Sequence, residues 1–132
     1  MQVLFDEILR RLRGSDQTEV YPSFDAVPVG KKSAALFTVL TAESVKLGTP
    51  FPEGACVCCP FSAVFTVSVL VPMTSPLETA EDHFYDRLLP RMRGIGCVLC
   101  EVRAARVDVK LGRIIMDARF TVSGISMEVV SA

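Results

Sequence analysis

Apolar residues recur with the period of a helix at the start of the chain. Residues 1–14, MQVLFDEILRRLRG, place acidic side chains early and arginines late, and Gly14 follows as a stop signal. The charged residues fall largely on the face opposite the apolar one. The apolar face consists of Val3, Leu4, Ile8 and Leu12. The pattern predicts an amphipathic helix that packs on the rest of the domain.

The next part of the chain changes to the two-residue period of β-strands. A short β-prone stretch, Thr18–Phe24, contains Pro22 and is therefore expected at a sheet edge. Ser33–Val45 predicts a strand with two fairly apolar faces, and Lys46–Ala55, rich in proline and glycine, predicts the loop of a long hairpin. In the returning strand, alternate residues separate onto two faces. One face holds Phe65, Val67, Val69 and Val71, and the other holds Thr66, Ser68 and Leu70.

A second helix is predicted to follow that strand. Ser75 is expected as its N-cap, with Pro76 at the first helical position and Glu78 completing a capping box. Apolar residues then repeat at helical spacing, so one face is expected to pack on the sheet. These residues are Leu77, Ala80, Phe84 and Leu88. Pro90 is expected to end or kink the helix, because it lacks the backbone N–H that a helix interior requires.

The last third of the chain predicts a hairpin with strands over residues 97–111 and 113–129. The alternation changes phase near Ala104–Arg106, which indicates a β-bulge or a break in the first of these strands. We find no internal repeat and expect one domain over residues 1–132. The expected fold class is α+β, with a mainly antiparallel sheet, an N-terminal helix and a second helix packed on the sheet.

The composition is unusually rich in hydrophobic residues, which raises the question of where they are buried. Half of the 132 residues are hydrophobic, and the mean hydropathy of +0.40 is high for a soluble monomer. No segment has the roughly 20 apolar residues of a membrane helix, and the first residues lack the apolar stretch of a signal peptide. We therefore expect a cytoplasmic protein whose surplus apolar surface contacts other subunits. The net charge of −1 and the scattered basic residues predict no specific nucleic-acid binding.

Two C-x-x-C pairs, Cys56–Cys59 in CVCC and Cys97–Cys100 in CVLC, raise the question of a zinc site. Both lie in strand-like segments. Residues three apart on a regular strand point to opposite faces, so Cys97 and Cys100 are not expected to chelate one ion together, unless Gly96 distorts the backbone. A redox pair would follow a strand and open a helix, and neither pair does. Packing as small apolar side chains is the favoured interpretation, with zinc and redox chemistry as alternatives.

Candidate catalytic residues are few. His83 is the single histidine, and the sequence offers no evident orienting acid or oxyanion donor for it. GKKS, residues 30–33, lacks the glycine spacing of a phosphate-binding loop, and RGIG, residues 93–96, matches no dinucleotide fingerprint. We therefore expect neither an enzyme nor a cofactor.

The order of elements, the length and the apolar surplus together resemble the tail-terminator proteins of long-tailed, lambda-like bacteriophages. The most local similarity is EDHFYDRLLPRMRGIG, residues 81–96, where an amphipathic helix runs into an Arg-x-x-Pro-x-Met ending before the closing hairpin. The strand FTVSVLVP, residues 65–72, leads directly into that helix and is similar too, as is the N-terminal helix. The resemblance covers nearly the whole chain as an architecture, although five cysteines depart from the lambda-type pattern.

This resemblance implies a phage or prophage structural protein that closes into a ring, commonly a hexamer, on the tail tube. Such a ring stops tube growth and joins the tail to head-completion proteins within the virion. Ring contacts consume apolar surface on two sides of each subunit, which Ala34–Leu40 and Phe65–Val71 are expected to provide. The loop Lys46–Ala55 is expected to reach a neighbour through Phe51. Candidate lumen or docking charges are Lys31, Lys32, Lys46, Arg103, Arg106, Lys110 and Arg113.

Two alternatives stay open. One is another head–tail connector or minor tail protein built on a similar sheet. The other is a small oligomeric ligand-binding protein or enzyme, in which His83, Tyr85 or Arg119 would line a pocket between subunits.

Overall fold

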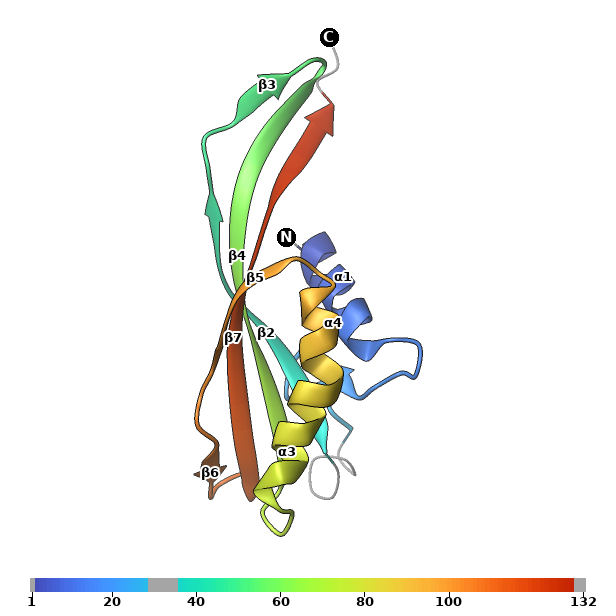
Figure 1. Cartoon of the computed structure of the whole chain (residues 1–132), viewed down its shortest axis with the longest axis vertical. Helices are drawn as coiled ribbons and strands as arrows, with labels where there is room; N and C mark the ends of the chain where they lie inside the picture. Colours follow the sequence, from blue (N-terminus) through green and yellow to red (C-terminus); the bar gives the residue numbers. More distant parts are fainter. Residues whose placement is uncertain (1, 29–35, 130–132) are drawn as a thin grey trace.

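The structure, a computed structural model, describes residues 2–28 and 36–129 as helices packed on one sheet (Figure 1). The fold is α+β with a mainly antiparallel sheet, as the sequence predicts. The helical segments are α1 (Gln2–Arg13), α3 (Leu77–His83), a π-helix η1 (Phe84–Leu88) and α4 (Leu89–Arg93). The strands are β1 (Val20–Tyr21), β2 (Phe37–Leu47), β3 (Phe51–Glu53), β4 (Cys56–Pro72), β5 (Cys97–Val102), β6 (Arg106–Asp108) and β7 (Arg113–Val129).

Two long strands form the spine of the sheet. β4 and β7 pair antiparallel along their whole length, from Cys56 opposite Val129 to Pro72 opposite Arg113. The strand order is β1-β2-β4-β7-β5, with β3 paired to β4 and β6 paired to β7. β1 runs parallel to β2, at an edge of the sheet, where Pro22 was expected to confine it.

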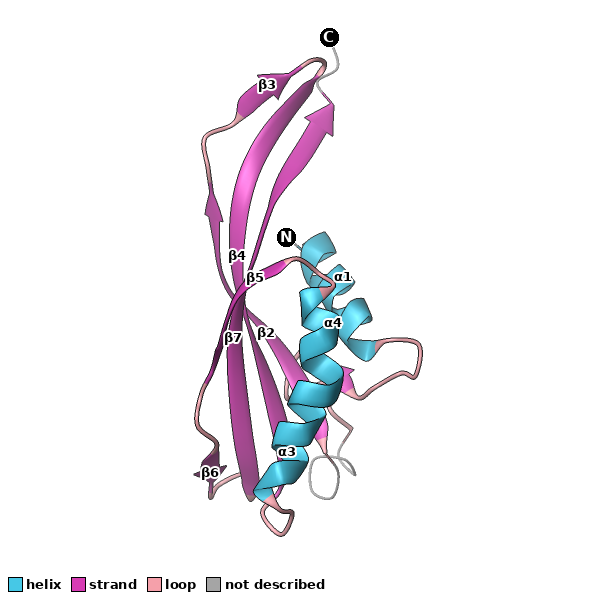
Figure 2. Cartoon of the chain, in the orientation of Figure 1, coloured by secondary structure: helices cyan, strands magenta, loops and turns pink. Residues whose placement is uncertain are grey.

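The helices cover one face of the sheet (Figure 2). The predicted alternation in β4 is confirmed, because its odd-numbered apolar residues pack into the main core beneath the helices. These are Phe65, Val67, Val69 and Val71, and they meet Ile8, Leu12, Ala80, Phe84, Leu88 and Met92 from the helices. Two predicted helix faces need correction at their ends. Val3 in α1 and Leu77 in α3 are exposed, and Leu9 is buried where no core position was predicted.

The other face of the sheet is apolar only at one end. Val27, Phe37, Val39, Leu70 and Ile115 form a small second cluster there, with Tyr21 and Phe24 packed against it. The prediction of a two-sided apolar strand holds for the first four residues of β2, which are buried. The remaining residues of β2 are exposed, because nothing among the described residues covers that part of the sheet.

The second helix departs from its predicted start and finish. Pro76, not Ser75, is the N-cap, and no side chain caps the helix, so the predicted capping box is wrong. Pro90 does not end the helix, which continues through it as α4. In the π-helical segment before it, the Leu89 N–H donates to the Phe84 carbonyl oxygen. We attribute this segment to the Pro90 ring, which would collide with the carbonyl of Asp86 in a regular α-helix.

Irregularities in the strands explain two further features of the sequence. The predicted break near Ala104–Arg106 is confirmed, since the register moves from Val102 opposite Ala118 to Arg106 opposite Ile115. From Val102 to Arg106 the chain that forms β5 and β6 advances four residues, whereas β7 advances three residues over the same distance. The predicted loop Lys46–Ala55 is partly wrong, because β2 continues through Leu47 and β3 pairs back onto the start of β4.

Candidate assembly surfaces

The spine extends past the helical layer at the end that carries β3 (Figure 1). We call this part, residues 42–62 and 123–129, the projecting ribbon. Its β2 and β3 residues are exposed, whereas the first four residues of β2, beside the helices, are buried. The ribbon is therefore a β-structure that the described helices leave largely uncovered.

An apolar groove lies where the ribbon passes the first turn of α1. It is lined by Val3, Leu4, Glu7, Leu47, Phe61 and Ser126 and has a volume of about 550 Å³. Val3 is 83% exposed and Leu47 is 71% exposed, so both present apolar surface to solvent. Gly124 makes room for Phe61, because a Cβ at Gly124 would lie 3.0 Å from the Phe61 ring. Gly124 on β7 thus allows the Phe61 ring on β4 to lie over its backbone.

A second set of exposed apolar residues lies at the opposite end of the subunit. Its members are Met73, Leu77, Tyr85 and Val107. They belong to the β4–α3 connection, the helix and β6, which Figure 1 places away from β3. We call this the lower apolar set. Each subunit therefore carries an apolar groove beside α1 and, away from it, a set of exposed apolar side chains.

The uncovered face of the sheet carries a charged hollow at its middle. Its volume is about 250 Å³, and it is lined by Thr41, Glu43, Thr66, Ser68, Arg103, Arg106, Asp117 and Arg119. Arg106 Nη2 lies 3.1 Å from Asp117 Oδ2, and Ser68 Oγ donates to Asp117 Oδ1 over 2.6 Å. Its two carboxylates, Asp117 and Glu43, are thus paired with Arg106 and Arg119, and Arg103 remains as a third positive charge in the lining.

Glu43 links three strands of that face. The β2–β4 register shifts between Ala42 and Ser44, so Glu43 is the extra residue of a bulge. Its carboxylate accepts a hydrogen bond from Thr66 on β4 and pairs with Arg119 Nε on β7 at 2.9 Å. The bulge directs this side chain of β2 across the sheet toward β4 and β7.

The predicted interface residues do not form one surface. Lys46 and Phe51 are exposed on the projecting ribbon, Arg103 and Arg106 line the charged hollow, and Lys110 is exposed in the turn before β7. Lys31 and Lys32 lie outside the described residues. The strands expected to supply ring contacts are also corrected. Phe37–Leu40 and all the apolar residues of Phe65–Val71 are buried within the subunit, and residues 34–35 lie outside the described residues.

Arg113 is not a docking charge, contrary to the sequence-based expectation. Its side chain is 1% exposed, and its Cζ lies 4.9 Å from the centroid of the Phe37 ring. Burial lowers the pKa of this guanidinium. As the first residue of β7, it faces the small apolar cluster, where its stem packs and its cation stacks on the aromatic face.

Cys97 and Cys100 are arranged differently from the prediction. Cys97 pairs with Val122 and Cys100 pairs with Phe120, two positions on the same face of β7. A register shift between Cys97 and Leu99 inserts Val98 as an extra residue, so the two cysteines share a face. The expectation that they point in opposite directions is therefore wrong. Within residues 2–28 and 36–129, no group of three or more His, Cys, Asp or Glu side chains is arranged to hold a metal ion.

The residues considered for a pocket between subunits lie apart within the chain. Tyr85 lines a hollow with Glu81 and Ala105, while Arg119 lines the charged hollow on the other face. Burial lowers the pKa of His83, the positive charges of Arg87 and Arg91 lower it further, and Asp16 opposes them. One subunit does not gather these three side chains into a shared cavity.

Comparison with known proteins assigns no family to the chain, so the surfaces described above are the basis for its proposed function. Of the helices in the described part of the chain, none is long and apolar enough to cross a bilayer. Neither a protein-family model nor a curated protein sequence matches the chain.

Proposed function

We propose that this chain is a structural subunit that assembles with copies of itself into a ring and has no enzymatic activity. The observation that carries the proposal is the presence of two separate sets of exposed apolar residues on the subunit, the groove beside Leu47 and the lower apolar set. Single exposed apolar residues are normal in proteins, but clustered ones mark interaction sites.

The positions of the two surfaces favour a head-to-tail arrangement. Two copies related by a two-fold axis would bury the same patch on each, whereas head-to-tail contacts bring two different patches together. Repetition of such a contact gives a closed ring when the rotation between neighbours divides a full turn. The groove beside Leu47 has a concave shape that a protruding apolar side chain of a neighbour would fill.

In its specific form, the proposal is a tail-terminator protein of a long-tailed phage or prophage. The order of helix, hairpin, helix and hairpin supports this form, together with the apolar surface left uncovered on the subunit. The ring would contain about six copies, bind the end of the tail tube and present another surface to head-completion proteins. It would assemble in the bacterial cytoplasm and remain in the virion.

Light scattering and electron microscopy of the purified chain test this proposal. We expect a ring with a central channel, and we expect Leu47→Asp to dissociate it, because a carboxylate would be buried in an apolar contact. Val98→Asp is the matched control, since Val98 is also an exposed strand residue and lies outside both apolar surfaces. A wild-type chain that stays monomeric at concentrations up to hundreds of micromolar would refute the ring.

A further inference from the structure

We propose that Cys97 and Cys100 form a two-thiolate site for a soft monovalent metal ion, of which Cu(I) is the representative. The inference rests on the bulge at Val98 and is independent of the ring assembly. It assigns a binding role to two cysteines that pack against the main core and also line one hollow at the surface.

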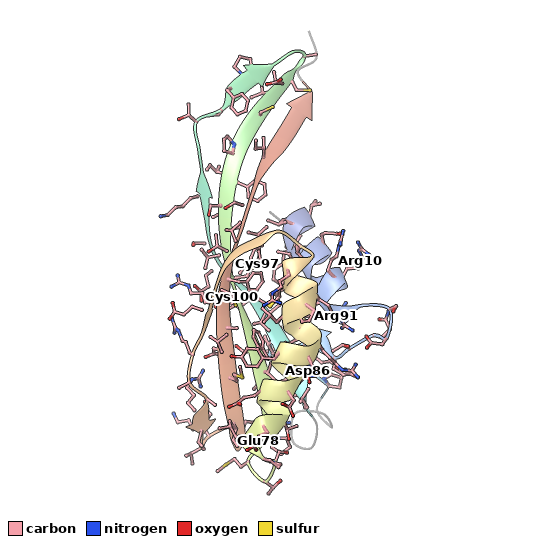
Figure 3. All side chains as sticks on the ribbon, in the orientation of Figure 1. Arg10, Glu78, Asp86, Arg91, Cys97 and Cys100 are labelled. Carbon is pink, nitrogen blue, oxygen red and sulfur yellow. The ribbon has the colours of Figure 1, made fainter. Side chains whose placement is uncertain are left out.

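The bulge creates the pair. In a regular strand, residues three apart lie on opposite faces, but Cys97 and Cys100 pair with Val122 and Phe120, which lie on one face of β7. Val98 takes up the extra position and is 65% exposed. The two thiols are thus successive side chains on the helix-facing side of β5, and Figure 3 shows them near each other beside the helix.

The pair borders an accessible hollow. This hollow has a volume of about 270 Å³ and is lined by Leu89, Arg93, Cys97, Val98, Cys100 and Val102. Both cysteines are half-buried, and β5 is the last strand of the sheet, so an ion can approach from the sheet edge. Arg93 lies in the last turn of α4 and contributes a positive charge.

A cation bound between the two cysteines would relieve the repulsion between two thiolates at these adjacent positions. Binding replaces two S–H protons by one Cu(I), so two protons leave and the dithiolate complex carries one negative charge. Arg93 offsets that charge.

The number of ligands selects the ion. Zinc in structural sites takes four ligands, and within the described part of the chain no third His, Cys, Asp or Glu joins this pair. Thiolates select soft ions such as Cu(I), and a closed-shell monovalent ion accepts two sulfur ligands in a line. Cys97 and Cys100, on adjacent positions of one face, supply these two sulfurs.

The other same-face pair offers an internal comparison. Cys56 and Cys58 are two apart on β4 and so point the same way, but Cys58 is buried. Glu53 lies opposite Cys56 in the β3–β4 register and brings a carboxylate to this pair. A nearby carboxylate disfavours an anionic dithiolate complex, so we expect the copper to prefer Cys97 and Cys100.

The test is a titration of the reduced full-length chain with Cu(I) under anaerobic conditions, against a competing Cu(I) chelator. We expect one ion per chain, a thiolate-to-copper absorption band and two sulfur neighbours by X-ray absorption. Cys97→Ser and Cys100→Ser should each weaken binding by at least about tenfold, while the Cys56→Ser/Cys58→Ser variant should bind like the wild type.

Thermal unfolding of each variant separates lost binding from lost folding. If Cys97→Ser fails to fold, Arg93→Ala provides a second variant, in which the thiols remain and the affinity should fall severalfold. Wild-type affinity in a folded Cys97→Ser/Cys100→Ser chain would overturn the proposal. Binding that depends instead on Cys56 and Cys58, or a coordination shell with three or four sulfurs, would overturn it equally.

Discussion

Arg91 on α4 donates through Nη1 to the carbonyl oxygen of Leu12, at 2.8 Å, and so closes the C-terminal end of α1. The same nitrogen reaches the Arg13 carbonyl at 3.1 Å and the Thr18 hydroxyl at 2.9 Å. Nη2 contacts both carboxylate oxygens of Asp16 at 3.1 Å. Carbonyls at a helix end have no partner within their helix, so one guanidinium here satisfies them and ties two helices together.

Replacement of Arg91 should therefore destabilise the fold. For Arg91→Ala we expect a loss of about 2 kcal/mol in the free energy of unfolding, because the part-buried Leu12 carbonyl loses its donor, whereas the Arg13 carbonyl still accepts from the Thr18 N–H. Arg91→Lys should recover only part of it, since an ammonium group cannot span the same set of acceptors. Urea denaturation followed by circular dichroism measures both. Equal stability of Arg91→Ala and the wild type would show that the contacts are incidental.

Gly14 should resist substitution for two reasons that can be separated. Its φ is +65°, and an added Cβ would lie 2.8 Å from Arg91 Cζ. Gly54 has a similar φ of +60° with nothing within 4 Å of its Cβ position, so Gly54→Ala reports backbone strain alone. We expect Gly54→Ala to lower the free energy of unfolding by about 1 kcal/mol. Gly14→Ala should lower it by clearly more. Equal losses would mean that the Arg91 contact adds nothing.

Asp16 should make stability depend on pH in the acid range. Its hydrogen bond from Thr18 and its contacts with Arg91 hold its pKa below the ordinary value of 3.8. A carboxyl group whose pKa is lowered on folding stabilises the fold above the unfolded pKa, and that contribution disappears as the pH falls through the folded pKa. Asp16→Asn should therefore be less stable than the wild type near pH 7. The difference in stability between the two chains should shrink as the pH falls below 3.8, and a difference that does not change with pH in that range would exclude this origin.

Arg113 should contribute to stability through packing on Phe37. We expect Arg113→Ala to cost about 2 kcal/mol, from lost cation–π contact and lost burial of the side-chain stem. Lys110→Ala is the matched control, because Lys110 is exposed three residues earlier and should change the free energy of unfolding by less than about 0.5 kcal/mol. Chemical denaturation of both variants measures the difference. A similar small effect for both would argue against a structural role for Arg113.

The spacing of apolar residues predicted the helices and strands well where the helical layer covers the sheet. Phe65, Val67 and Val69 alternate because helices cover only one face of β4, and that coverage leaves a clear signal in the sequence. The alternation continues to the margin of the helical layer, where Phe61 is half-buried and Leu47, opposite it on β2, is exposed. Apolar residues there look the same in sequence as core residues, so the sequence could not show which of them remain exposed.

Local irregularities were the other source of error. The bulge at Val98 moves Cys100 to the face of Cys97, and the phase of a strand cannot be read across an unrecognised extra residue. Arg113 looked like a surface charge because arginines usually are, and its burial depends on Phe37, which lies far from it in sequence. Such contacts are set by the tertiary arrangement and leave no local pattern.

The mass of the assembled species in native mass spectrometry tests the central claim most directly. We predict that the wild-type chain forms one closed species of about six copies and that Leu47→Asp shifts it to single subunits. A wild-type chain found only as single subunits, or a Leu47→Asp chain with an unchanged copy number, would contradict the account.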